Sequence, residues 1–149
     1  MIIIFASINA IILTCLSALH FYWMCGGKFD FTQSLPTTTE GKRVLNPRPF
    51  ECGVMAIIFL FIAIFFLNFA GIQILDFPNW VLKYGMWLLS GIFLLRAIGD
   101  FKYIGFTKIV RTTEFAQLDS KYYAPLCLFL SVTCGLLDWW VGQLVFIAH

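Results

Sequence analysis

Four long apolar segments alternate with polar ones along this chain, at residues 2–24, 52–75, 80–98 and 124–147. A helix needs about 20 predominantly apolar residues to cross the hydrocarbon core of a bilayer. A transmembrane β-strand would instead alternate apolar and polar residues over about ten positions, and these segments are apolar on every side. The pattern therefore predicts an all-α polytopic membrane protein. We expect a bundle of four transmembrane helices that forms one domain over residues 1–149.

The polar segments predict how the helices connect. Gly26 and Gly27 favour the end of the first helix, and Pro125 suits the first turn of the fourth. Only a few residues around Asp76 and Pro78 join the second helix to the third, which indicates an antiparallel hairpin. Prolines, glycines and hydroxyl residues in residues 25–51 indicate a loop with turns.

The connection over residues 99–123 has a different composition. Basic residues alternate there with apolar ones, a mixture typical of a segment that lies on the membrane surface. The apolar members are Phe101, Ile104, Ile109, Phe115 and Leu118, and the basic ones are Lys102, Lys108, Arg111 and Lys121.

Composition supports a membrane protein. The chain is 60% hydrophobic and only 12% charged, whereas a soluble domain has about 45–50% apolar and about 25% charged residues. The net charge is +2 and there is no basic run, so nothing indicates a nucleic-acid partner. The expected partners are membrane lipids, and a homo-oligomer or a membrane-protein partner is left open.

The distribution of Lys and Arg predicts an orientation. Nine of the ten basic residues fall in the 25–51 and 99–123 connections or at their edge, and Lys83 alone belongs to the other side. Cytoplasmic loops carry the excess of Lys and Arg in membrane proteins. We therefore expect both connections to be cytoplasmic and both termini to lie outside the cytoplasm.

Ionisable and polar groups near the cytoplasmic ends of the helices are the first candidates for a binding site, because such groups are costly at membrane depth. Arg96 and Asp100 are spaced i, i+4 and can pair. They can form a pocket in which Arg96 and His20 receive a polar or anionic ligand, or they can form an interfacial anchor without a ligand, which is the slightly favoured interpretation. The candidate binding residues at this mouth are His20, Tyr22, Trp23, Arg96, Asp100, Lys108 and Asp119.

A second group of polar residues is expected deeper in the membrane, toward the outer side. It comprises Asn9, Asn68, Gln73 and Asp138. Asp138 is a carboxylate in an apolar helix, and a proton or cation relay would use such a group. The favoured alternative is that Trp139 and Trp140 mark the interfacial aromatic belt, so that Asp138 touches water and the amides join helices.

No familiar catalytic or cofactor motif is present. The sequence has no GxSxG, HExxH, P-loop or Rossmann fingerprint. His20 and His149 fall at opposite ends of the predicted bundle, and the five cysteines show no metal-ligand spacing. We expect no metal and no cofactor, and an enzyme is the less favoured class.

Three ordered motifs carry a resemblance to a known family. They are ALHFYWMCGG at the end of the first helix, LLRAIGDFKYIGFTK at the end of the third, and FAQLDSKYYAPLCL at the start of the fourth. The chain resembles a family of small bacterial four-helix membrane proteins that is catalogued only as a domain of unknown function. The resemblance implies a bacterial inner membrane protein, and its signature positions here are His20, Trp23, Gly26, Gly27, Arg96, Gly99, Asp100, Gly105, Phe115, Asp119 and Pro125.

Three functional hypotheses follow. The first is binding or transport of a small polar or anionic molecule, a lipid or an ion at the cytoplasmic mouth. The second is an accessory or scaffold subunit whose basic connections dock on a partner or on anionic lipid. The third and weakest is an enzyme that modifies lipid headgroups, with His20 as general base and Arg96 holding phosphate.

Overall fold

The computed structural model describes residues 1–28, 31, 34–38, 40 and 42–147, the last five of these in their backbone only. The long helices are α1 (Ile2–Met24), α2 (Pro49–Phe69), α3 (Asn79–Ile98) and α5 (Ala124–Ile147). A short helix, α4 (Glu114–Leu118), and a π-helix, η1 (Asp119–Tyr123), lead directly into α5. Four helical spans are long and apolar enough to cross a membrane, and the described residues contain no strand. The predicted fold class is confirmed.

The ends of α1 and α2 are set by local backbone chemistry. Beyond α1, Gly26 has φ +87, and the N–H of Gly27 donates to the carbonyl of Tyr22 at 3.0 Å. The second helix begins at Pro49, three residues before the expected start, because the Glu51 carboxylate accepts the N–H of Arg48 and caps it. It ends at Phe69 and not at Leu75, because the chain turns at Gly71, where φ is +88.

The fourth span begins earlier than predicted. Residues from Glu114 onward are helical, and the side chain of Thr113 caps this helix by accepting the N–H of Ala116 at 3.2 Å. Proline at 125 removes a backbone donor inside this long helix. The π-helical turn η1 immediately precedes it, with the Ala124 N–H donating to the Asp119 carbonyl, so Pro125 is accommodated inside a helix that it was expected to begin.

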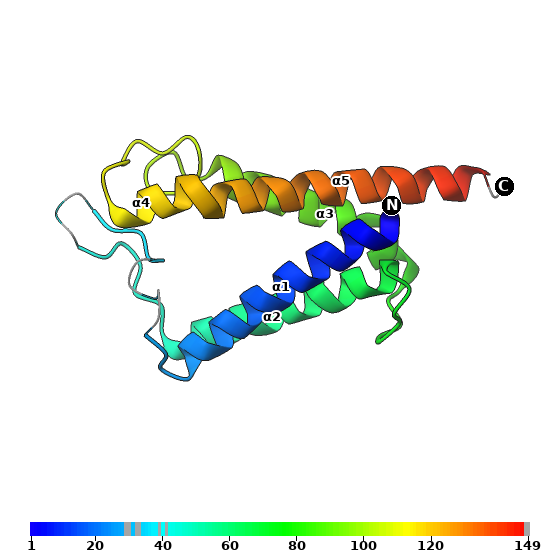
Figure 1. The fold of residues 1–149 in the computed structure, drawn as a ribbon, viewed down its shortest axis with the longest axis horizontal. Coiled ribbons are helices and arrows are strands. Elements are labelled where there is room, and N and C mark those ends of the chain that lie inside the picture. Colours follow the sequence, from blue (N-terminus) through cyan, green and yellow to red (C-terminus); the bar gives the residue numbers. More distant parts are fainter. Residues whose placement is uncertain (29–30, 32–33, 39, 41, 148–149) are drawn as a thin grey trace.

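The long helices pack as two antiparallel pairs, α1 with α2 and α3 with α5 (Figure 1). The pairs meet near the N-terminus of α1 and separate toward the opposite end (Figure 1). At the meeting point, Phe5 and Trp140 have ring centroids 5.7 Å apart, and Ala6 and Ala10 are buried. The four helices are therefore joined at one end and open at the other.

Polar side chains link the helices at three points, as is common where lipid supplies no hydrophobic force between them. Ser17 of α1 donates to the Ala56 carbonyl of α2 at 2.7 Å. Ser90 of α3 and Ser131 of α5 each donate to the other's carbonyl, at 3.0 and 2.9 Å. Each pair thus carries its own hydroxyl-to-backbone link.

The third link joins the two pairs. The hydroxyl of Thr133 on α5 donates to Oδ1 of Asn9 on α1 at 3.0 Å. Both side chains are buried, with exposed fractions of 2% and 0%. This contact lies on the side where the pairs meet, so it fixes α1 against α5.

The loop after α3 folds back onto the end of that helix. Gly99 and Gly105 have φ +90 and +83. A Cβ on Gly99 would overlap the backbone carbonyl of Ile104, and a Cβ on Gly105 would overlap that of Ile98. The Phe106 N–H then donates to the Ala97 carbonyl at 2.9 Å. The two glycines therefore allow residues 99–107 to close over the C-terminal carbonyls of α3.

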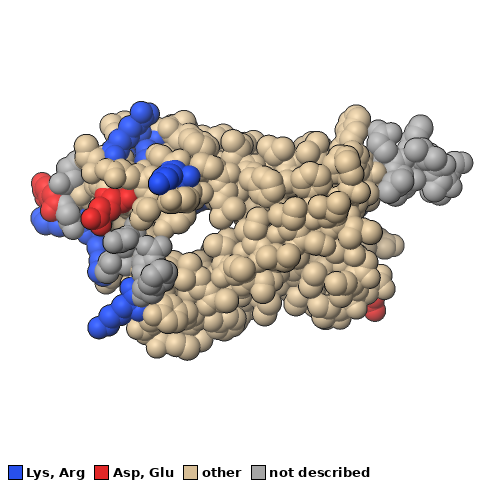
Figure 2. Space-filling model, viewed as in Figure 1, with Lys and Arg blue, Asp and Glu red and all other residues tan. Residues whose placement is uncertain are grey.

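Charged side chains gather at the open end of the molecule, while the surface of the spans is almost uncharged (Figure 2). Both chain ends lie at the opposite end (Figure 1). The even number of spans therefore places the two basic connections together, as the charge pattern predicted.

The close backbone approach at Gly99 and Gly105 can be tested by substitution. Gly99→Ala and Gly105→Ala should each lower the free energy of unfolding by about 2–4 kcal/mol, because alanine at positive φ is strained and its Cβ overlaps backbone. Gly91→Ala is the control, since a Cβ there meets nothing within 4 Å. Unfolding of the detergent-solubilised variants measures the difference. Equal stability of the three variants would contradict the close backbone approach at Gly99 and Gly105.

Candidate functional site

Asp119 is the centre of a buried ionic cluster at the open end of the α3–α5 pair. Its Oδ1 accepts from Arg96 Nη2 at 3.0 Å, and its Oδ2 accepts from Lys108 Nζ at 2.9 Å. The N–H of Gly105 donates to the same Oδ2 at 2.7 Å. The side chains of Asp119 and Lys108 are 0% and 1% exposed. Two cations and a backbone donor therefore compensate the cost of burying this carboxylate.

The cluster also fixes the loop that carries it. Besides Asp119, Lys108 Nζ donates to the Gly105 carbonyl at 3.0 Å and to Ser120 Oγ at 2.7 Å. The ammonium group of Lys108 therefore uses its three donors within the protein. Neither Lys108 nor Asp119 has an unused donor or charge that a ligand could engage, and both act as structural groups.

Asp100 has a separate role in the same loop. Its Oδ1 accepts the backbone N–H groups of Lys102, Tyr103 and Ile104 at 2.7–3.0 Å. Desolvation is the largest single influence and raises the pKa of this carboxyl, but the hydrogen bonds from Ile104, Tyr103 and Lys102 together outweigh it and lower the pKa below its ordinary value. Asp100 is thus an ionised cap for the turn after Gly99.

The predicted Arg96–Asp100 pair is wrong. Helix α3 ends at Ile98, and the positive φ of Gly99 turns the chain, so Asp100 is no longer one helical turn beyond Arg96. Arg96 pairs with Asp119, 23 residues away in the sequence. Its second terminal nitrogen, Nη1, is buried without a hydrogen-bond partner in the described part of the chain.

His20 belongs to the other helix pair. Its Nδ1 lies 2.8 Å from the Leu16 carbonyl, and because a carbonyl only accepts, Nδ1 carries the proton and Nε2 is the acceptor of the neutral ring. The ring packs against Trp23 and Phe59, with centroid distances of 4.9 and 5.1 Å. Among the described residues, no hydrogen bond or ring contact joins His20 to the Asp119 cluster. The predicted mouth is therefore divided between the two pairs.

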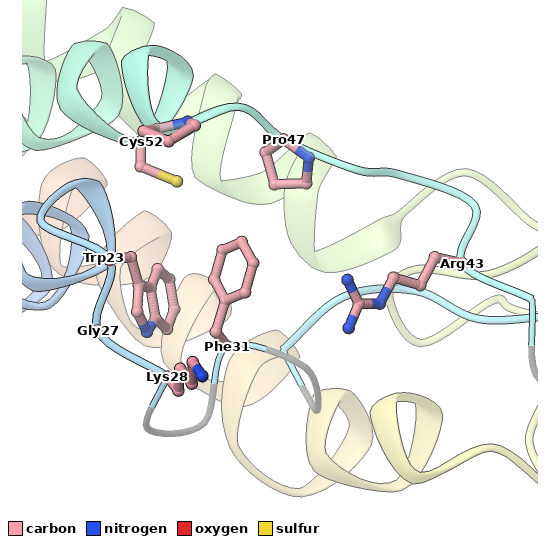
Figure 3. A pocket seen from close by; sticks show the side chains of 9 residues that line it. Trp23, Gly27, Lys28, Phe31, Arg43, Pro47 and Cys52 are labelled. Carbon is pink, nitrogen blue, oxygen red and sulfur yellow. The ribbon is translucent and has the colours of Figure 1, made fainter.

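A cavity opens beside Trp23, at the basic end of the α1–α2 pair. Its volume is about 350 Å³. Lys28 follows the end of α1, Arg43 extends from the far limb of the loop, and Phe31 stands between them (Figure 3). Trp23, Pro47 and the buried Cys52 complete an apolar wall. The cavity therefore combines two exposed cations with aromatic and aliphatic surface.

A smaller cavity of about 170 Å³ adjoins the first and reaches His20. The two cavities share four wall residues: Trp23, Phe31, Pro47 and Cys52. Phe31 packs edge-on against Trp23 at 5.6 Å between ring centroids. The remaining candidate, Tyr22, is 48% exposed and covers Gly27, outside both cavities. Of the predicted mouth residues, His20 and Trp23 therefore line cavities.

Sequence reasoning missed Lys28, Phe31, Arg43, Pro47 and Cys52 as wall residues. The basic residues were visible only as part of a charge count. Their convergence depends on how the loop returns toward α2, where the N–H of Val44 donates to the Pro36 carbonyl and that of Thr38 to the Lys42 carbonyl, each at 2.8 Å. Nothing in the spacing of these residues indicates that closure.

The predicted outer polar layer is dispersed in the structure. Asn9 bonds Thr133, whereas Nδ2 of Asn68 donates to the Leu75 carbonyl at 2.8 Å and braces the turn after α2. Gln73 is exposed in that turn. Asp138 is half-buried and lines a cavity together with Trp87. These four residues do not form one site.

Metal-ligating groups are not clustered in the described part of the chain. No three His, Cys, Asp or Glu side chains lie there in positions to hold a metal ion.

Comparisons with known proteins bear on the family and leave its function open. Residues 13–134 match the model of a family described as "Protein of unknown function (DUF3995)". No curated protein and no solved structure matches the chain. The matched residues include the ends of α1 and α3, the ionic cluster and the start of α5, so the resemblance seen in the sequence is confirmed.

The ionic cluster predicts strong coupling between its members. Asp119→Asn should lower the free energy of unfolding by about 3–5 kcal/mol because it leaves the Lys108 ammonium buried without its counter-charge. Adding Lys108→Met should restore part of this loss, so that the double variant is about 0.5–3 kcal/mol more stable than the sum of the single effects.

The exposed Lys42–Glu40 pair is the matched control, because its side chains are 81% and 73% exposed and 3.5 Å apart. The corresponding Lys42→Met and Glu40→Gln changes should show coupling near zero. Denaturant unfolding in detergent gives both cycles. Additive losses at Lys108 and Asp119 would contradict their assignment as a structural pair.

Proposed function

The chain belongs to the DUF3995 family of proteins of unknown function. From the geometry of its basic end, we propose that it binds an anionic amphiphile there. The site is the cavity beside Trp23, with Lys28 and Arg43 as the anion-binding groups. The four apolar helices fit an integral membrane protein. The proposed ligand is an acidic lipid whose phosphate contacts the two cations.

The chemistry of the cavity supports this ligand class. Arginine presents a planar fork that matches phosphate oxygens, and lysine adds a compact positive charge. Neither Lys28 nor Arg43 forms an ion pair with a described residue. The wall formed by Trp23, Phe31 and Pro47 offers apolar surface to the glycerol and upper acyl region, in the amphipathic arrangement typical of tryptophan at membrane interfaces.

The size and position of the cavity support the same conclusion. A volume of about 350 Å³ lies within the usual range of about 300–1,000 Å³ for small-molecule sites. The cavity adjoins the end of α1, where the helix leaves the apolar segment. A headgroup at this depth would keep its charge at the interface and its chains in hydrocarbon.

The proposal includes an orientation. Nine of ten basic residues lie in the two connections at this end or at their edge, which supports a cytoplasmic position for the cavity and an outer position for both termini. The proposed membrane is a bacterial inner membrane, in which acidic lipids of the cytoplasmic leaflet would meet the cavity. Figure 2 shows the charged side chains at this end.

The geometry gives less support to catalysis. The enzyme hypothesis required His20 as base and Arg96 as phosphate ligand. Arg96 is paired with Asp119 on the other helix pair. Among the described residues, Glu51 is the carboxylate that lines the same cavity as His20. Glu51 already accepts the Arg48 N–H.

The test is the retention of acidic lipid by the purified full chain. Lys28→Gln combined with Arg43→Gln should weaken binding of phosphatidylglycerol about 30-fold, from about 1 kcal/mol for each cation at an anionic surface. Native mass spectrometry of protein from nanodiscs of phosphatidylglycerol and phosphatidylcholine measures the bound lipid.

The matched control changes two cations of the other connection, Lys102→Gln with Lys121→Gln. That variant should retain phosphatidylglycerol as the unchanged protein does. An equal loss in both variants would indicate a diffuse surface charge, and no loss in either would refute the site. Retention of a protein partner in place of lipid would support the scaffold hypothesis instead.

A further inference from the structure

The α3–α5 pair holds another cavity at the end of the molecule opposite the basic connections. Its volume is about 710 Å³. Its polar and aromatic wall residues are Asn79, Lys83, Tyr84, Trp87 and Asp138. It lies on a different helix pair from the Trp23 cavity, so a ligand here is independent of the proposed lipid site.

Charge is rare at this end, yet two opposite charges line this one cavity. Among the described residues, the charged side chains here are those of Asp76, Lys83 and Asp138. Asp76 lies in the exposed turn after α2, whereas Lys83 and Asp138 belong to the cavity. Lys83 and Asp138 do not form an ion pair with each other or with another described residue. Both charges therefore remain for a ligand.

The positions of the two charges define the shape of that ligand. Lys83 and Trp87 are four residues apart on α3, so they lie on one face in successive turns. Asp138 lines the same cavity from α5. The two charges therefore face one cavity from two different helices.

The walls add apolar and aromatic surface. Leu82, Val141 and Phe69 line the cavity, and the rings of Tyr84 and Trp87 are 57% and 69% exposed. Lys83 Nζ lies 5.3 Å from the centre of the Tyr84 ring. Asp138 therefore shares its cavity with aromatic as well as aliphatic surface.

We infer that this cavity binds a small zwitterion with an apolar substituent, of the amino-acid type, from the outer aqueous side. Its ammonium contacts Asp138, its carboxylate contacts Lys83, and its side chain lies against the apolar wall. A simple cation is opposed by Lys83, and a simple anion is opposed by Asp138. A zwitterion satisfies both charges at once.

The test uses L-phenylalanine as the probe, with equilibrium dialysis against the detergent-purified full chain. Saturable binding is expected, and phenethylamine and 3-phenylpropionate, which each lack one charge, should bind at least about tenfold more weakly. The variants Asp138→Asn and Lys83→Gln should each weaken phenylalanine binding by at least about tenfold. Asp76→Asn and Lys102→Gln are the matched controls and should leave binding unchanged.

Lys83 is exposed, so Lys83→Gln keeps the test decisive if Asp138→Asn fails to fold. Absence of saturable phenylalanine binding would overturn the inference. The inference would also be overturned if phenethylamine bound as tightly as phenylalanine, or if the Lys83→Gln variant bound phenylalanine as tightly as the unchanged protein. Displacement of phenylalanine by phosphatidylethanolamine but not by soluble amino acids would overturn it as well. None of these outcomes concerns the lipid site beside Trp23.

Discussion

The buried carboxylate of Asp119 is the interaction on which the basic end of the α3–α5 pair depends. A carboxylate that is 0% exposed is stable only if its charge and lone pairs are met within the protein. Arg96, Lys108 and the Gly105 N–H meet them from three places in the chain. Each of these contacts also positions a structural element, because Arg96 closes α3, Lys108 anchors the loop and Asp119 begins η1.

The two helix pairs consequently differ at the end where the basic residues gather. In the α3–α5 pair, Arg96 and Lys108 form ion pairs with Asp119. The loop after α3 is closed where Gly99 and Gly105 approach each other. In the α1–α2 pair, Lys28 and Arg43 face a cavity and form no ion pair with a described residue. The cations of the ionic cluster in one pair are therefore neutralised within the protein, whereas those at the cavity of the other pair are exposed. The two pairs separate toward this end (Figure 1).

Hydropathy was sufficient to predict the four spans, because backbone hydrogen bonds in hydrocarbon must be satisfied within each segment. It was not sufficient for the ends of α2 or the start of the fourth span, which depend on the Glu51 cap, Gly71 and the π-helical turn before Pro125. The i, i+4 spacing suggested an Arg96–Asp100 pair, since it assumed that the helix continued. The partner that Arg96 has, Asp119, becomes its neighbour only through the folding of a loop. Likewise His20 and Trp23 were identified from their depth, while Lys28 and Arg43 needed the path of the loop to α2.

If the Trp23 cavity holds the headgroup of an acidic lipid, as we propose, an experimental map of the protein in nanodiscs of phosphatidylglycerol will show it. Elongated density in this cavity is expected, with its phosphate between Lys28 and Arg43 and its chains leaving along Trp23 toward the hydrocarbon. An empty cavity, or phosphate density beside Lys102 and Lys121 with none beside Lys28 and Arg43, would contradict the claim.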